Sequence, residues 1–139
     1  MVSVASGRLG DMDTKDVARW VAAYERAWRS PGTEALAGLF TADAVYSPGP
    51  YEEPVVGLPA IGIMWERERS GPDEDFTMTS EVVAVDGDTA VVRVEVHYGG
   101  PTKQEFRDLW VMRFAVDGRC RAFEEWPFAP RPRAATRAS

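Results

Sequence analysis

One carboxylate, Asp108, occupies a position where acid–base chemistry can be expected. It lies in a segment of alternating character, and the face that it shares is otherwise apolar, with Phe106, Trp110, Met112 and Phe114. Burying an unpaired carboxylate on such a face costs free energy or raises its pKa. A raised pKa beside a cavity suits a general acid or base at neutral pH. The alternatives are a structural ion pair, for example with Arg107 or Arg113, and exposure at the strand end.

Further acidic residues stand in the last predicted strand, whose orientation the sequence leaves open. A shift of one residue decides whether the inward set is Ala122, Glu124 and Trp126 or Phe123 and Glu125. The residue pattern taken alone slightly favours the first set.

Other residue types that carry chemistry offer less. The only histidine, His97, falls on a polar face with Arg93 and Glu95, so we expect it in solvent or at a subunit contact. Ser47 and Cys120 have no visible histidine partner and are not predicted to be nucleophiles. No Cys/His cluster has zinc spacing, and no phosphate loop or dinucleotide fingerprint is present. We therefore predict no metal site and no cofactor.

The bulk properties are those of one globular domain. The chain has 139 residues, 45% hydrophobic and 27% charged, and a formal net charge of −6, which disfavours binding to nucleic acid. A single cysteine fits a reducing compartment. No signal peptide and no apolar run of roughly 18 residues is visible, so we expect a cytoplasmic protein with no membrane contact.

Helical periodicity predicts three helices before residue 70. The first begins at Asp13 or Thr14 and ends at residues 30–32, and its apolar face consists of Val17, Trp20, Val21, Tyr24, Ala27 and Trp28. We expect Thr33 to cap a shorter second helix, which carries Leu36, Leu39 and Phe40.

A short strand over 44–46 and a loop over 51–57 follow that helix. Pro59 suits the first turn of a third helix, whose apolar side holds Ile61, Met64 and Trp65.

From Phe76 onward the period changes to two, which predicts four long antiparallel strands in two hairpins. Asp86-Gly87 and Asp117-Gly118 mark the turns. The first hairpin should pair Glu81 with Arg93 on its polar face. Its inward face should hold Phe76, Met78, Val82, Ala84, Ala90, Val92, Val94 and Val96.

These elements make an α+β domain over residues 13–128, with helices on one face of the sheet. We predict a flexible N-terminal tail over 1–12 and a flexible basic C-terminal tail over 129–139.

Four short segments resemble the nuclear transport factor two-like (NTF2-like) superfamily, in particular its SnoaL-like branch. They are AYERAW at 23–28, LFTADA at 39–44, GLPAI at 57–61 and EEW at 124–126. The resemblance covers roughly residues 13–128. It implies a cone in which three N-terminal helices pack against a strongly curved antiparallel sheet and enclose a pocket. Members include ketosteroid isomerases, limonene epoxide hydrolases, scytalone dehydratases and polyketide cyclases, beside domains with no chemistry.

The resemblance also assigns candidate roles. Tyr24 matches the isomerase tyrosine that donates to the substrate oxygen, although a core tyrosine would show the same pattern. The isomerase base and second donor correspond here to Ser47 and Trp110, which argues against that mechanism. Glu125 matches an acidic pocket residue of the epoxide hydrolases, which favours the register with Phe123 and Glu125 inside. In that register Glu125 lies diagonal to Asp108, so that one of the two could hold a proton at neutral pH. Surface exposure of Glu125 is the alternative.

The hypothesis from the sequence is a cofactor-free domain that binds a small, apolar, cyclic molecule, with Asp108, Glu125 and Tyr24 as candidate catalytic residues. Cyclisation, isomerisation, dehydration and epoxide hydrolysis all fit. The predicted pocket lining is Trp20, Trp28, Tyr46, Trp65, Trp110, Met112, Phe123 and Trp126. The competing hypothesis is a non-catalytic ligand-binding or dimerisation module. We also predict a homodimer through the outer sheet face, where Leu109 and Val111 point outward.

Overall fold

The first helix begins at a strong capping signal. The computed structural model describes residues 11–69, 75–99 and 104–130, and in it α1 spans Thr14–Trp28. The Asp13 side chain accepts from the Asp16 backbone N–H at 2.8 Å, and the Asp16 carboxylate accepts from the Asp13 N–H at 3.1 Å. This reciprocal pair satisfies backbone donors that a helix start leaves unpaired. The predicted helix and its buried face are confirmed.

The second helix is shorter than predicted. Helix α2 covers only Leu36–Leu39, Thr33 does not cap it, and Phe40 already begins strand β1, Phe40–Ser47. Gly38 has low helix propensity, and Phe40 pairs with Cys120 across the sheet. Tertiary pairing therefore ends the helix early. Within the predicted loop 51–57, Val55–Val56 forms strand β2, which pairs antiparallel with β1.

The third helix and the four long strands agree with the sequence pattern. Helix α3 spans Leu58–Glu68, with Pro59 in its first turn. The strands are β3 (Phe76–Asp86), β4 (Thr89–Tyr98), β5 (Gln104–Phe114) and β6 (Cys120–Phe128). Gly87 and Gly118 have φ of 61° and 89°, the left-handed conformation that their turns require.

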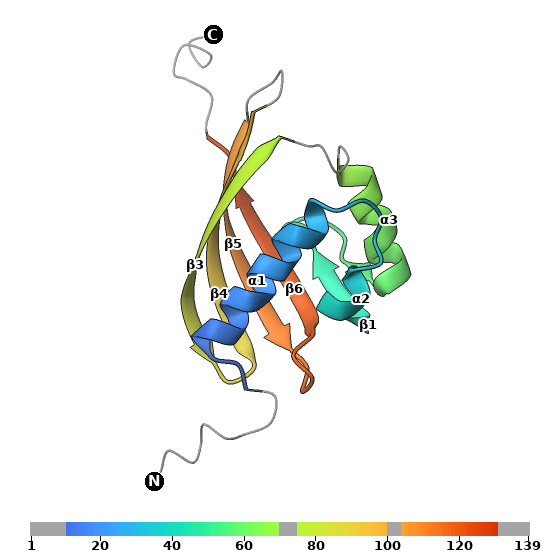
Figure 1. Cartoon of the computed structure of the whole chain (residues 1–139), viewed down its shortest axis with the longest axis vertical. Helices are drawn as coiled ribbons and strands as arrows, with labels where there is room; N and C mark the ends of the chain where they lie inside the picture. The colour runs from blue at the N-terminus through green and yellow to red at the C-terminus, as the bar shows by residue number, and fades with distance from the viewer. Residues whose placement is uncertain (1–10, 70–74, 100–103, 131–139) are drawn as a thin grey trace.

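All six strands form one curved sheet in the order β2-β1-β6-β5-β4-β3, and α1 lies across its inner face (Figure 1). Strand β1 runs parallel to β6, whereas the other neighbours are antiparallel. The α+β class predicted from the sequence is confirmed, with three helices and a curved six-stranded sheet that contains one parallel pair.

The first hairpin has the predicted register up to one irregularity. Glu81 pairs with Arg93, and their side chains form an ion pair. The register then shifts between Val82 and Ala84, so that Ala84 is exposed and Val85 packs against the core instead. The prediction that Ala84 points inward was wrong because it assumed strict alternation, which a bulge interrupts.

The predicted flexible tails, 1–12 and 129–139, lie mostly outside the described residues. Met12, placed in the flexible tail, donates its backbone N–H to the Gly87 carbonyl at 3.0 Å and packs against the core. Residues 1–10 and 131–139 lie outside the described residues.

Among the described residues, no helix has the length and apolar character needed to cross a membrane. The dimer through the outer face stays a prediction.

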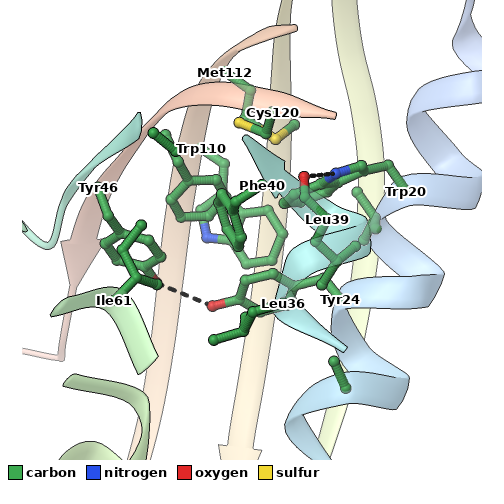
Figure 2. Close-up of a cluster of buried hydrophobic side chains, with 14 of the residues drawn as sticks. Trp20, Tyr24, Leu36, Leu39, Phe40, Tyr46, Ile61, Trp110, Met112 and Cys120 are labelled. Atoms are coloured by element: carbon green, nitrogen blue, oxygen red, sulfur yellow. Dashed lines mark hydrogen bonds between the residues drawn. The ribbon is translucent and has the colours of Figure 1, made fainter. Parts of the chain in front are cut away.

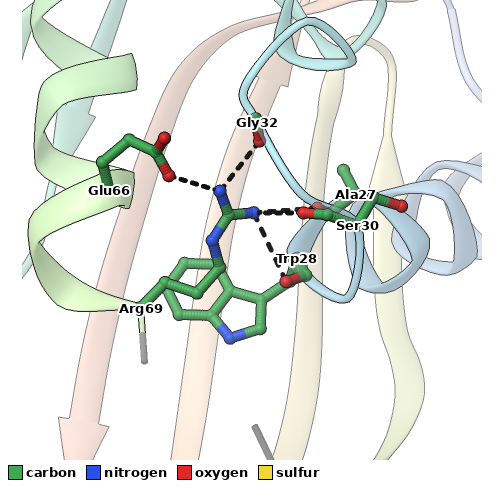
Figure 3. Close-up of polar contacts among 6 residues, drawn as sticks. All are labelled: Ala27, Trp28, Ser30, Gly32, Glu66 and Arg69. Carbon is green, nitrogen blue, oxygen red and sulfur yellow. Dashed lines mark hydrogen bonds and ion pairs between the residues drawn. The ribbon is translucent and has the colours of Figure 1, made fainter. Parts of the chain in front are cut away.

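A buried arginine joins the end of α1 to the end of α3. The Arg69 guanidinium donates to the backbone carbonyls of Ala27, Ser30 and Gly32 at 2.8 to 3.1 Å (Figure 3). It also pairs with Glu66, one turn back on α3. The last carbonyls of a helix have no partner within the helix, so one planar side chain satisfies the end of α1 and fixes the chain that leaves it.

We predict that Arg69→Ala lowers the free energy of unfolding by about 3 kcal/mol, because it removes charged hydrogen bonds to buried carbonyls. Arg69→Lys should recover only part of this loss, since an ammonium cannot reproduce the planar fork. Urea denaturation measures both. Arg67→Ala on the exposed side of α3 is the control and should change stability by less than about 0.5 kcal/mol. Equal losses for positions 67 and 69 would contradict the role assigned to Arg69.

Candidate functional site

A cavity of about 960 Å³ opens between the inner face of the sheet, helices α1 and α3, and the loop that follows β1. Aromatic, proline and aliphatic residues form most of its walls, and its most buried aromatic residues are Tyr24, Tyr46, Trp65 and Trp110. Pockets of this size, apolar with few polar groups, are typical of small-molecule sites.

Five acidic residues of the described chain line this cavity, and two of them, Asp108 and Glu125, are not exposed to solvent. Asp108 lies on β5 and is only 7% exposed, and Glu125 on β6 stands directly opposite Trp110 in the strand register. The sequence pattern slightly favoured Ala122, Glu124 and Trp126 as the inward set of β6, and this was wrong. Phe123 is buried and Glu125 lines the cavity, whereas Glu124 is exposed. The register follows the pairing of Met112 with Phe123, which keeps two apolar side chains on the core face.

Burial dominates the ionisation of this pair. It raises the pKa of Asp108, and the polar groups of Glu125 and Trp110 offset part of that rise. Burial raises the pKa of Glu125 to about 8, helped by the negative charge of Asp108 and opposed by a hydrogen bond from Tyr46. Two interacting carboxyls of this kind titrate as a unit. At neutral pH the pair therefore holds a proton, which an ordinary pair of surface acids would have lost.

Two tyrosines continue from the pair into the core. The Tyr46 hydroxyl donates to Glu125 Oε1 at 2.7 Å, and the hydroxyls of Tyr24 and Tyr46 are 3.1 Å apart (Figure 2). Because Tyr46 gives its proton to Glu125, the hydroxyl of Tyr24 is the donor between the two tyrosines. Burial, followed by the negative charge of Glu125, raises the pKa of both phenols well above the usual value. Both remain neutral donors.

The ion pairs considered for Asp108 are not formed. Arg107 lies 3.4 Å from Glu105, and within the described residues no arginine forms a salt bridge with Asp108. Within the described residues, the Oδ1 atom of Asp108 is buried and has no hydrogen-bond partner. His97 lies on the polar face as predicted, half exposed and 3.8 to 3.9 Å from Glu95 and Glu105.

The predicted pocket lining is divided between cavity and core. Trp28, Tyr46, Trp65 and Trp110 line the cavity. Trp20, Met112 and Phe123 do not line it, because they pack in the solid core beside it, and the Trp20 N–H donates to the Leu39 carbonyl at 3.0 Å. Trp126 does not line it either, since it is 40% exposed on the outer face beside Leu109. The position of a residue along an apolar face distinguishes inward from outward side chains. It does not distinguish side chains of the filled core from those that line the cavity.

Two features of the site were missed by the sequence reasoning. Segment 48–54 was predicted only as a strand end and a connecting loop, yet it lines one side of the cavity. Tyr46 was placed in the lining without a role, although it is the residue that contacts Glu125. The spacing of Tyr46 in an apolar strand carried no signal of its partner 79 positions later.

The proton held by Glu125 predicts a pH-dependent stability. An unfolded glutamate ionises near pH 4.5, and the folded one near about 8, so unfolding between these values releases a proton. The free energy of unfolding should therefore fall as pH rises across this window, and Glu125→Gln should flatten the decline. Chemical denaturation at a series of pH values measures this. Glu124→Gln, one residue away on the outer face, should keep the wild-type slope, and identical slopes in all three proteins would refute the assignment.

Comparisons with known proteins agree with the fold. Residues 17–123 match the family model described as SnoaL-like domain. No sequence among curated proteins matches the chain.

Solved structures show the same architecture at low identity. The epoxide hydrolase/cyclase-like enzyme SalBIII, described for pyran ring formation in the polyether salinomycin, has a TM-score of 0.68 and 17% identity over 84% of this chain and 93% of its own. An LEH-like epoxide hydrolase of M. tuberculosis has a TM-score of 0.60 and 16% identity, and the match covers 83% of this chain and 84% of its own. A ketosteroid isomerase-like protein of Erwinia carotovora atroseptica has a TM-score of 0.61 and 20% identity, and the match covers 84% of this chain and 97% of its own. At these identities the likeness establishes the fold alone, while the sequence match over residues 17–123 establishes the family. The chain belongs to the SnoaL-like domain family.

Proposed function

We propose that this protein is a cofactor-independent acid–base enzyme that acts on a small, largely apolar, cyclic molecule. The observation that carries the proposal is the Asp108–Glu125 pair, which faces an aromatic cavity and holds a proton at neutral pH. A site that offers an acid and a base side by side can move two protons in one step.

Opening of a strained cyclic ether by water is the reaction that uses both members of the pair. Glu125 gives its proton to the ring oxygen while the carbon–oxygen bond breaks. Asp108 takes a proton from the water whose oxygen forms the new bond to carbon. The pair then passes the proton from Asp108 back to Glu125, and the product is a diol. Ring closure follows the same scheme when a hydroxyl of the substrate replaces water.

The tyrosines serve this scheme as positioning residues. Tyr46 holds the Glu125 carboxyl at one orientation, and Tyr24 holds Tyr46. Since the hydroxyl of Tyr24 is used by Tyr46, we assign Tyr24 to orientation of the acid rather than to direct contact with a substrate oxygen. Two structural relatives, an epoxide hydrolase/cyclase-like enzyme and an LEH-like epoxide hydrolase, support the reaction class.

The test uses phenyl glycidyl ether, a small aromatic epoxide, at neutral pH. We expect the wild-type protein to hydrolyse it to the diol, which mass spectrometry detects. Glu125→Gln and Asp108→Asn should each lower the rate by about a hundredfold or more, because each removes one of the proton-transfer groups.

Glu124→Gln is the matched control and should retain the wild-type rate. If the wild-type protein formed no diol above the buffer rate, the acid–base proposal would be rejected in favour of a non-catalytic binding module. Equal rates in the Glu125→Gln and Glu124→Gln variants would reject it as well.

A second prediction concerns Tyr46→Phe. Its hydroxyl stabilises the ionised form of Glu125, so its removal should raise the pKa of Glu125 above about 8. The acid then keeps its proton to higher pH, and the alkaline limb of the rate profile should move upward by a measurable fraction of a unit. Tyr24→Phe, which removes a hydroxyl one step further away, should give a smaller displacement. A limb that moves downward would contradict the proposed donor direction.

A further inference from the structure

The buried polar atoms that lack a partner gather at one place. Within residues 11–69, 75–99 and 104–130 they are Trp65 Nε1, Trp110 Nε1 and Asp108 Oδ1, and all three residues line the cavity. Each unpaired buried donor or acceptor costs free energy, and native proteins contain few of them. Their concentration around a single cavity calls for a physical reason.

The tryptophans away from the cavity give the contrast. The Trp20 indole donates to the Leu39 carbonyl at 3.0 Å, and the Trp126 indole donates to Glu124 at 2.9 Å. Neither residue lines the cavity. These two indoles have protein acceptors at hydrogen-bond distance. The indoles of Trp65 and Trp110 have none, although the Trp110 side chain lies close enough to Asp108 to lower the pKa of that carboxyl.

Trp110 stands beside the carboxyl pair. It follows Asp108 by two residues on β5 and is paired across the sheet with Glu125. In Figure 2 its indole nitrogen lies on the edge of the ring that faces the hydroxyl ends of Tyr24 and Tyr46. The Trp110 ring is 2% exposed and rests on Tyr24 and Phe123, with centroids 4.7 and 5.0 Å away.

Trp65 approaches the same space from helix α3. Its ring is 1% exposed and meets Tyr24 and Trp28 edge to face, with centroid distances of 5.1 and 4.8 Å. Ring contacts of this kind do not replace the hydrogen bond to oxygen that Trp65 Nε1 lacks. Both indoles are donors only, so no proton transfer within the protein can satisfy them.

We propose that the indole N–H groups of Trp110 and Trp65 are specificity-determining donors, which hold an acceptor oxygen of the ligand, such as a carbonyl or ring ether, beside the Asp108–Glu125 pair. Both indole nitrogens are buried in the protein alone, so ligand binding must turn each ring to bring its N–H to the bound oxygen. A ligand without that oxygen leaves both donors unpaired, and such sites reject it strongly. The inference rests on the proposed function only in placing the ligand in this cavity, and it requires no turnover.

The experiment compares two probes of nearly equal shape, 1-tetralone and tetralin, which differ by the carbonyl oxygen. Calorimetry or ligand-observed NMR gives the two dissociation constants with the wild-type chain. We expect 1-tetralone to bind about tenfold more tightly than tetralin or better, because only the ketone pairs the indole donors.

Replacement of Trp110 by 3-benzothienylalanine, through amber suppression, exchanges N–H for sulfur and keeps the bicyclic shape. It should abolish most of the preference for the ketone and leave the affinity for tetralin unchanged. The same replacement at Trp65 should reduce the preference. At Trp20 it should lower thermal stability, since the bond to Leu39 is lost, without changing the ratio of the two dissociation constants.

Three results would overturn the inference. They are equal affinities of the wild-type chain for the two probes, a ketone preference that survives replacement at both 65 and 110, and no binding of either probe at its solubility limit. Binding is read without catalysis, so a negative result with phenyl glycidyl ether leaves a ketone preference standing. Conversely, epoxide turnover combined with equal probe affinities would reject this inference alone.

Discussion

The packing of one ring, Phe123, supports the whole site. It is 1% exposed, and aromatic neighbours surround it with ring centroids 4.7 to 5.9 Å away, namely Trp20, Tyr24, Phe40, Tyr46 and Trp110. Three of these neighbours carry their polar groups on the cavity side, while Trp20 and Phe40 belong to the solid core. Phe123 therefore forms the boundary between filled interior and open space. Aromatic pairs of this kind contribute beyond the area that they bury.

A rigid boundary explains why unfavourable ionisation can persist. A carboxyl group whose pKa is raised by burial would be relieved if the chain moved to admit water or an arginine. The wall cannot easily do so, because Tyr24 and Tyr46 are fixed on Phe123 from α1 and β1, and Arg69 fixes the far end of α1 to α3. The energetic cost of the site is thus carried by packing elsewhere in the domain.

Much of this architecture could be predicted from local signals. Local signals predicted most element positions and the inward direction of Asp108. These signals are the cap at Asp13, the turns at Gly87 and Gly118 and the alternation of β5. The pattern failed where distant residues decide: Phe40 leaves its helix to pair with Cys120, a bulge displaces Ala84, and the register of β6 depends on the partner of Phe123. The contact between Tyr46 and Glu125 was out of reach for the same reason. Periodicity describes one element at a time, whereas a site depends on side-chain contacts between elements.

The position of β6 in the sheet has a consequence for biosynthesis. This strand lies between β1 and β5, so β1 and its short partner β2 have no place in the sheet until residues 120–128 have been made. Pairing between segments so far apart in the chain is slow, because a large loop must close first. Until then β1 and the helices packed on it, α2 and α3, lack the strand that joins them to the rest of the sheet, and their apolar sides stay exposed in the nascent chain.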